Sequence, residues 1–166
     1  MPKITPWLWF ADEAEEAAGF YVSILPDSRI DRVVRYPADC PGGPAGSVAV
    51  VEFTLAGQRV AALNGGSRQE FGHAVSLAFE CEEQAELDRV WDGLSAGGTK
   101  EQCGWLKDRY GVSWQIVPSR LGTMMNDPDR TRAARVMRAM MDMVKLDIAA
   151  LERAYEGGPA LTDLRG

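Results

Sequence analysis

The sequence predicts an α+β fold in which two related modules, each built of strands and one helix, precede a long C-terminal helix. Strand-like alternation is followed by an amphipathic helical segment and then by more strands, and this order occurs twice. Shifting the chain against itself by about seventy residues supports a repeat. Apolar positions then fall on apolar positions, with Trp9 on Phe79 and Tyr21 on Trp91.

The first module is predicted over residues 3–66. Its opening strand covers residues 4–10, where aromatic and β-branched side chains are frequent. A helix is predicted over residues 13–25, with Asp12 placed to cap its first turn. The apolar face of this helix recurs at helical spacing and consists of Ala14, Ala17, Ala18 and Tyr21.

Three more strands are predicted after this helix. Residues 29–36 have the composition of a strand, and residues 37–47 are rich in proline and glycine, which is typical of a loop. Residues 48–66 predict two strands joined by a tight turn at Ala56 and Gly57. The first module is therefore a strand, a helix and three strands.

The second module is predicted over residues 72–120 and repeats this order. Residues 74–81 predict a strand, and residues 82–94 predict a helix whose apolar face is formed by Leu87, Val90, Trp91 and Leu94. A glycine pair ends the helix. Residues 99–108 and 111–118 then predict two strands, which leaves open whether this module is one strand shorter than the first.

Both modules fit in one domain of residues 1–122, and a single helix is predicted beyond it over residues 126–156. Asn126 or Asp127 can cap this helix. Its apolar stripe should be buried against the outer surface of the sheet or a partner subunit, although flexible methionines could instead bind substrate. The stripe consists of Met137, Met140, Met141, Val144, Ile148 and Leu151. Residues 157–166 are predicted to be a flexible tail.

The overall charge argues against two classes of partner. The chain carries 24 acidic and 18 basic side chains, a formal net charge of −6, so we expect no nucleic-acid partner. Its apolar runs are too short to cross a bilayer, and we expect a cytoplasmic protein with no membrane partner. The local cluster of arginines is interpreted as a solvated helix face and consists of Arg130, Arg132, Arg135 and Arg138.

The cysteines and the histidine limit the possible chemistry. Cys40, Cys81 and Cys103 are widely spaced and form no C-x-x-C, so neither a disulfide framework nor a structural zinc site is expected. His73 is the only histidine, which excludes any mechanism that needs two imidazoles from one chain. Cys103 is the one plausible nucleophile, and its activation would need Lys107 or another cation to lower the pKa of its thiol.

Four segments carry a resemblance to a known family: FADEAEEAAGFYVSILPDS, LNGG, CGWLKDRYGVSWQIVP and MRAMMDMVKLDIAAL. They resemble the PhnB-like proteins, also labelled the 3-demethylubiquinone-9 3-methyltransferase domain family, within the vicinal oxygen chelate (glyoxalase/bleomycin-resistance) superfamily. The resemblance covers residues 3–155. It implies paired βαβββ modules whose curved, mixed sheets enclose a pocket, usually in a homodimer.

The resemblance also implies where a divalent metal would be held. Enzymes of the superfamily use His and Glu side chains on the inner faces of strands, and those positions fall here near Pro6, Asn64, Ser76 and Gln115. Proline has no side-chain donor atom, and neutral oxygen ligands bind divalent ions poorly without carboxylate or imidazole. We therefore expect no metal. His73 lies three residues before Ser76, and this odd offset predicts a side chain on the opposite face.

The methyltransferase part of the family label implies a bound methyl-donor cofactor. Methyltransferase folds with a doubly wound sheet bind that cofactor at a glycine-rich turn between a parallel strand and a helix. The glycine pairs of this sequence, at residues 42–43, 65–66, 97–98 and 157–158, do not lie in a G-x-G-x-x-G pattern. We therefore expect neither this chemistry nor a cofactor.

The predicted function is the binding of a small, partly aromatic molecule in a pocket between the modules. The predicted site residues are Trp7, Trp9, Asn64, Ser76, Cys103, Trp105 and Gln115. Gln115 would face the pocket while Trp114 packs under the helices. The alternative for these residues is that the indoles are core and the amides satisfy backbone groups. Asp108 either closes its turn through its side chain or acts as a general base.

A second function remains open at this stage. The protein could be a metal-dependent or cysteine-dependent enzyme that acts on a small oxygenated substrate. The identity of the ligand is not encoded in any motif of the chain.

Overall fold

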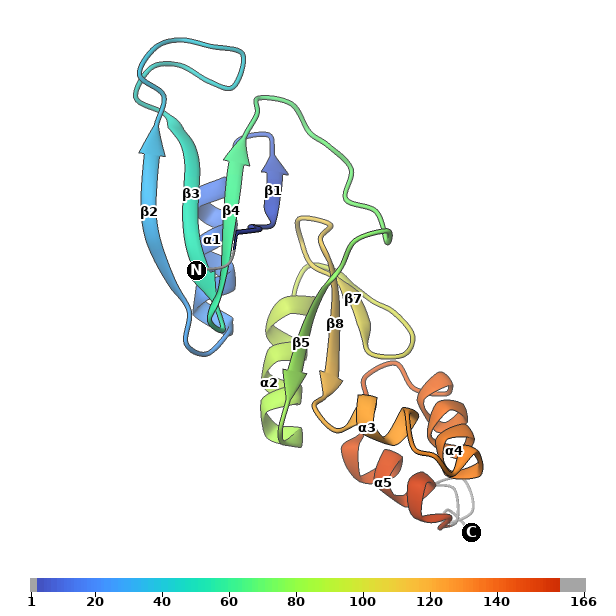
Figure 1. The fold of residues 1–166 in the computed structure, drawn as a ribbon. Helices are drawn as coiled ribbons and strands as arrows, with labels where there is room; N and C mark the ends of the chain where they lie inside the picture. The colour runs from blue at the N-terminus through green and yellow to red at the C-terminus, as the bar shows by residue number, and fades with distance from the viewer. Residues whose placement is uncertain (1–2, 159–166) are drawn as a thin grey trace. The chain divides into compact units, whose positions relative to one another are not determined.

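The computed structural model describes residues 3–158 of the chain (Figure 1). The chain divides between Glu70 and Phe71 into two compact units, and each unit contains one four-stranded mixed sheet. The predicted α+β class is confirmed. The part of the predicted tail from residue 159 onward lies outside the described residues. Within residues 3–158, no helix is long and apolar enough to cross a membrane.

Unit 1 consists of one helix and four strands. Strand β1 runs parallel to β4, and the pairs β4–β3 and β3–β2 are antiparallel, which gives the order β1-β4-β3-β2. Its elements are β1 (Trp7–Phe10), α1 (Ala14–Ile24), β2 (Arg29–Arg35), β3 (Val48–Leu55) and β4 (Gln58–Asn64). The tight turn predicted between β3 and β4 is confirmed: Ala56 and Gly57 both have positive φ, as a two-residue hairpin requires.

The core of unit 1 lies between α1 and one face of the sheet. The four residues predicted as the apolar face of α1 have no exposed surface. The ring of Tyr21 stacks on that of Phe53 with centroids 6.4 Å apart. Three of these four residues are alanines, whose small side chains allow a helix to pack close to a sheet. Each fully buried side chain of the size of Phe53 contributes about 1.5–3 kcal/mol to folding.

The start of α1 differs from the prediction. Asp12 makes no cap; instead, the backbone N–H of Ala14 donates to Oδ1 of Asn64 at 2.8 Å. The side-chain amide of Asn64 donates in turn to the carbonyl oxygen of Val48 at 3.1 Å. Asn64 is buried at the end of β4, far from α1 in the sequence. A single amide therefore ties the first helix turn to two strands, a role that local pattern could not reveal.

Unit 2 contains the second sheet, in the order β5-β8-β7-β6, with β5 parallel to β8. Helix α2 contacts β5, β7 and β8, and the four residues predicted for its apolar face are almost fully buried. They pack against the layer that contains Leu106, Trp114 and Ile116. The elements are β5 (Leu77–Cys81), α2 (Gln84–Ser95), β6 (Thr99–Lys100), β7 (Trp105–Lys107) and β8 (Ser113–Pro118).

The single strand predicted over residues 99–108 is divided in two. Cys103 and Gly104 have φ angles of 61° and 80°, so the chain turns between β6 and β7 and the two strands pair antiparallel. The N–H groups of these two residues donate to the carbonyl oxygens of Met143 and Val144, at 2.8 and 2.9 Å. The N–H groups of this turn thus bond to the C-terminal segment and not to a neighbouring strand. Unit 2 consequently has four strands, as many as unit 1.

The two units have equivalent first strands, but their correspondence differs by one residue from the one that the sequence alignment gave. Gly65 N donates to the carbonyl oxygen of Phe10, and Ser119 N donates to that of Cys81, so Phe10 and Cys81 are equivalent. The sequence alignment, which placed Trp9 on Phe79, is therefore one residue out of register in this strand. The cause is a shorter connection to the helix in unit 2, residues 82–83 against residues 11–13.

The long helix predicted over residues 126–156 is interrupted. The structure has α3 (Leu121–Met125), α4 (Arg130–Met141) and α5 (Ile148–Glu156). The Asp129 carboxylate accepts from the N–H groups at the start of α4, and that of Asp147 accepts from Ala150 N at the start of α5. Because a new helix begins after Asp147, the predicted apolar stripe is not continuous. Leu151 is buried, whereas Met137 and Met141 are exposed.

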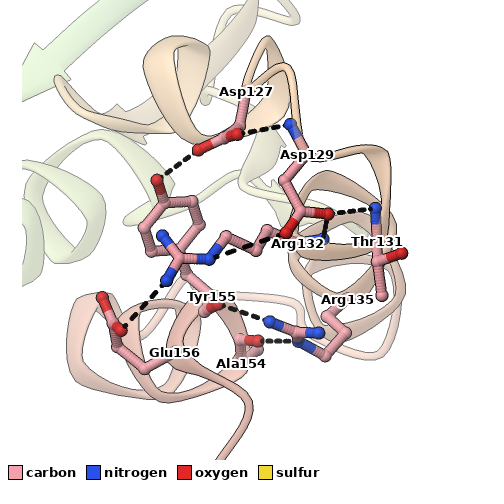
Figure 2. Close-up of polar contacts among 8 residues, drawn as sticks. All are labelled: Asp127, Asp129, Thr131, Arg132, Arg135, Ala154, Tyr155 and Glu156. Carbon is pink, nitrogen blue, oxygen red and sulfur yellow. Dashed lines mark hydrogen bonds and ion pairs between the residues drawn. The ribbon is translucent and has the colours of Figure 1, made fainter.

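A polar network holds α4 and α5 together (Figure 2). The guanidinium of Arg135 donates to the carbonyl oxygens of Ala154 and Tyr155, at 2.7 and 2.8 Å, at the C-terminal end of α5. The guanidinium of Arg132 lies 4.8 Å from the centroid of the Tyr155 ring, and the hydroxyl of Tyr155 donates to the carboxylate of Asp127. The predicted solvated face is therefore wrong for Arg135, which completes the end of α5, while Arg132 packs against the Tyr155 ring.

Replacing Asn64 by Ala tests the long-range cap. Asn64→Ala removes the acceptor of Ala14 N and the donor to Val48, and we expect the free energy of unfolding to fall by about 2 kcal/mol. Urea denaturation measures the change. Gln58→Ala, at an exposed position of the same strand, is the control and should be close to neutral. Equal losses in the two variants would contradict the cap.

The network of Figure 2 should contribute to the stability of the folded protein in a way that depends on pH. The hydroxyl of Tyr155, and then the N–H of Asp129, hold the pKa of Asp127 below its ordinary value of 3.8. A lowered folded-state pKa stabilises the protein above the ordinary value, and this stabilisation is lost as pH falls through the folded-state pKa. Asp127→Asn should therefore lower Tm by a few degrees near neutral pH, with a difference that vanishes in strong acid.

Thermal unfolding of both proteins at about pH 7 and about pH 2 measures this difference. Asp142→Asn, at an exposed position after α4, is the matched control. A Tm difference of the same size at both pH values would show that the charge of Asp127 is irrelevant.

Candidate functional site

Each sheet has one face covered by its helix and one face that the helix leaves uncovered. In β1, Leu8 and Phe10 are buried on the α1 side, whereas Trp7 and Trp9 point to the other side and are 57% and 38% exposed. In β8, Trp114 and Ile116 are buried on the α2 side, and Gln115 alternates with them. We call the uncovered side the open face of each unit.

Three predicted site residues come together on the open face of unit 2. The side-chain amide of Gln115 donates to the hydroxyl oxygen of Ser76 at 2.9 Å. Trp105 is the direct strand partner of Gln115 in the β7–β8 ladder, so the two side chains lie on the same face. All three residues are half-buried and therefore remain accessible.

Two residues that the site prediction omitted join this cluster. Nε2 of His73 lies 3.0 Å from Oε1 and 2.9 Å from Oε2 of Glu101, and the His73 ring centroid is 6.3 Å from that of Trp105. The N–H of Glu101 donates to the carbonyl oxygen of Trp105 at 2.9 Å. The strand-parity argument for His73 fails because β5 begins only at Leu77, so residues 71–76 do not alternate as a strand.

The turn after β7 fixes the strand that carries Gln115. The buried carboxylate of Asp108 accepts from the N–H groups of Tyr110 and Val112 at 2.8 and 3.1 Å, and from the indole N–H of Trp114 at 2.9 Å. The predicted closure of this turn by Asp108 is confirmed. Because Asp108 holds Trp114 on the α2 side, the following residue, Gln115, must point to the open face.

The cysteines are placed differently from the predicted pocket set. Cys103 lies in the turn between β6 and β7, where strand alternation does not apply, so alternation does not place its side chain on the face of Trp105. Its role as a site residue or nucleophile stays a prediction. Cys81 is buried, and burial raises the pKa of its thiol to about 12, which leaves it unreactive as a thiolate.

The predicted residues of unit 1 lie on both sides of their sheet. The indole N–H of Trp9 donates to the carbonyl oxygen of Ser67 at 2.8 Å, and its ring lies so close to Gly65 that an added Cβ would be 2.0 Å away. Trp7 is the strand partner of Ala61 on the open face. Asn64 is buried on the α1 side, where backbone groups use both ends of its amide. A ligand-binding role for Asn64 stays a prediction.

Comparison with known proteins identifies the family. The model of the 3-demethylubiquinone-9 3-methyltransferase family matches residues 2–117. The chain belongs to this family. A PhnB protein from Bacillus cereus is 36% identical, with a TM-score of 0.62 over 70% of this chain and 99% of that protein. A Pseudomonas aeruginosa protein is 21% identical, with a TM-score of 0.57 over 71% and 97% of the two chains. No curated protein matches the chain significantly.

The PhnB-like assignment made from the sequence is thus confirmed, and each of the two units contains the helix and four-stranded mixed sheet that the paired modules predict. The family match ends near the last residue of β8. Helices α3, α4 and α5 follow it in the sequence, so the family match does not include the segment MRAMMDMVKLDIAAL, which the resemblance over residues 3–155 had included.

The side chains at the four positions where the resemblance places metal ligands do not fit a divalent ion. Ser76 and Gln115 are neutral and bond to each other, and Oδ1 of Asn64 accepts from Ala14 N. Pro6 offers no donor atom. Throughout residues 3–158, no group of three or more His, Cys, Asp or Glu side chains is placed to hold a metal ion. Hard divalent cations need several charged or imidazole ligands, which these positions lack.

A hollow of about 560 Å³ lies elsewhere in unit 2, beside α3. Most of its lining residues are exposed, so it is a surface depression with little enclosure. Its lining consists of Ser119, Gly122, Thr123, Asn126, Asp127 and Pro128, none of which belongs to the predicted site. The open-face cluster of unit 2 is the better candidate because aromatic and polar side chains converge there.

Asp108→Ala tests how the turn positions β8. The substitution removes the acceptor of two backbone N–H groups and of the Trp114 indole, and we expect the free energy of unfolding to fall by about 3 kcal/mol. Urea denaturation followed by tryptophan fluorescence measures it. Asp92→Ala, at an exposed position of α2, is the control. A loss below about 1 kcal/mol would mean that the turn holds without its carboxylate.

Proposed function

We propose that this PhnB-like protein binds a small planar organic molecule on the open face of unit 2, without a metal ion. The observation that carries the proposal is the Ser76–Gln115 hydrogen bond beside Trp105, with the neutral pair in place of metal ligands. An indole offers a flat apolar surface, and the amide and hydroxyl offer directional polar contacts. Such a combination binds planar molecules that carry oxygen substituents.

Gln115 and Ser76 can still form hydrogen bonds to a ligand. The bond between them uses one N–H of Gln115 and a lone pair of Ser76. The amide oxygen of Gln115 and the hydroxyl proton of Ser76 have no other hydrogen-bond partner within residues 3–158. An acceptor and a donor therefore remain available side by side, and each can contribute about 0.5–1.5 kcal/mol to binding.

The open face of unit 1 supports the same kind of function. Trp7 and Trp9 present adjacent indoles on alternate positions of one strand. We propose that these rings also contact planar ligands, since exposed tryptophans on one sheet face are a frequent binding surface. A common pocket between the modules, homodimer formation and a cytoplasmic location stay predictions of the sequence.

Methyl transfer is not part of this proposal. Each described sheet has four strands with a single parallel pair, whereas cofactor binding in doubly wound folds uses the ends of several adjacent parallel strands. The alternative of a metal-dependent or cysteine-dependent enzyme also stays a prediction.

A ligand screen with two variants tests the proposal. Thermal unfolding against a panel of planar aromatic compounds should reveal compounds that raise the Tm of the wild-type protein. For those compounds, Gln115→Ala and Trp105→Leu should each weaken binding about tenfold, equal to about 1.4 kcal/mol. Equilibrium dialysis measures the affinities.

Gln102→Ala, an exposed amide in the neighbouring turn, is the matched control and should bind as the wild type does. A panel in which no compound binds the wild type, or affinities that are unchanged in both variants, would refute binding on this face.

A further inference from the structure

We propose that His73 and Glu101 form a proton acceptor for acidic phenolic hydroxyl groups, so that phenols with electron-withdrawing substituents are held as phenolates. This inference rests on the proposed binding function and names its ligand class. The two residues were outside the predicted site, and both lie at the edge of the cluster formed by Trp105, Ser76 and Gln115.

The geometry of the pair assigns the proton on the imidazole. Nε2 lies within 3.0 Å of both carboxylate oxygens of Glu101, and a carboxylate can only accept. Nε2 therefore carries a proton, and Nδ1 of the neutral ring has a lone pair. Within residues 3–158, Nδ1 makes no hydrogen bond. The His73 side chain is 56% exposed, so a ligand can reach this lone pair.

Glu101 is built to stabilise the ring after it accepts a proton. Its side chain is only 26% exposed, and its backbone N–H is fixed to the carbonyl oxygen of Trp105. The carboxylate of Glu101, 2.9 Å from Nε2, lies where it can pair with the positively charged ring that the proton transfer produces. Carboxylate-oriented imidazoles act as general bases by this same principle.

The surrounding loop holds His73 in place. The hydroxyl of Ser113, on β8, donates to the carbonyl oxygen of Gly72 at 3.3 Å, next to His73 in the sequence. The strands of this open face also carry Lys107, two residues beyond Trp105, and Glu80 on β5. Glu101 is the charged residue in direct contact with the imidazole.

Trp105 selects the shape of the ligand. Its ring centroid is 6.3 Å from that of His73, and the two planes are inclined by 48°. A planar molecule stacked on the indole therefore extends toward the imidazole with its edge. A hydroxyl on that edge can meet Nδ1, which selects phenols acidified by electron-withdrawing substituents, because aliphatic alcohols and unsubstituted phenols are too weakly acidic to transfer their proton to imidazole.

The step is a proton transfer without oxidation or reduction. The ligand O–H bond breaks, an Nδ1–H bond forms, and the phenolate oxygen keeps the electron pair. The products are a phenolate and an imidazolium, with the carboxylate of Glu101 on the other side of the ring. The positive ring thus lies between two negative groups.

The test uses para-nitrophenol, whose phenolate has a visible absorption band, and its methyl ether para-nitroanisole, which has no proton to give. Equilibrium dialysis measures the binding of each probe, and absorption measures the ionised fraction of bound para-nitrophenol. The measurements are made at a pH where the free probe is mostly protonated. We expect bound para-nitrophenol to be mostly phenolate and to bind about tenfold more tightly than para-nitroanisole.

Two variants assign the effect to the pair. His73→Gln should abolish the ionisation of bound para-nitrophenol and its tenfold preference, while para-nitroanisole binds as before. Glu101→Gln should reduce the ionised fraction, because the imidazolium loses its carboxylate partner. Glu80→Gln removes a negative charge from the same open face without touching His73, and it should leave ionisation unchanged.

Each outcome decides between the two proposals. If the wild type binds neither probe, both the proposed function and this inference are refuted. If both probes bind equally and para-nitrophenol stays protonated, ligand binding stands but the proton acceptor is refuted. If ionisation persists in His73→Gln or is lost in Glu80→Gln, the pair is not the acceptor.

Discussion

One-sided burial of each sheet is the constraint on which the rest of the structure depends. A single helix covers one face of each four-stranded sheet, so side chains must alternate between a buried side and an open side. On the covered side, Tyr21 in unit 1 and Trp91 in unit 2 are almost fully buried. The open sides carry indoles, amides and charges. Any residue that fixes strand register therefore also decides which side chains a ligand can meet.

Much of this arrangement could be predicted because it follows from local periodicity. The apolar faces of α1 and α2, the β3–β4 turn and the orientation of Gln115 depend only on spacings of two, three or four residues. The failures share a different cause. The cap on α1 comes from Asn64, and the turn at Cys103 and Gly104 is satisfied by carbonyl groups some forty residues later in the chain. No local pattern reports such partners.

The same limit explains why the candidate site was only partly predicted. Ser76, Trp105 and Gln115 were found because strand parity and family position applied to them. His73 was assigned to the wrong side because the parity rule was extended into a segment that is not a strand. Glu101 could not be predicted as a site residue, because the sequence contains many acidic residues. Only the structure shows that its carboxylate lies against the imidazole of His73. Side-chain pairing across a loop is a tertiary property.

The position of Glu101 also depends on the C-terminal segment. Met143 and Val144, between α4 and α5, accept hydrogen bonds from the turn that follows Glu101, and Gly104 is so close to the carbonyl oxygen of Ile116 that an added Cβ would be 2.8 Å away. The turn is thus held on one side by the C-terminal segment and on the other by β8. Because Glu101 enters this turn, a disturbance of the link between α4 and α5 should reach the imidazole through the backbone. The helices that follow the two modules therefore support the open face, although they contribute no side chain to its cluster.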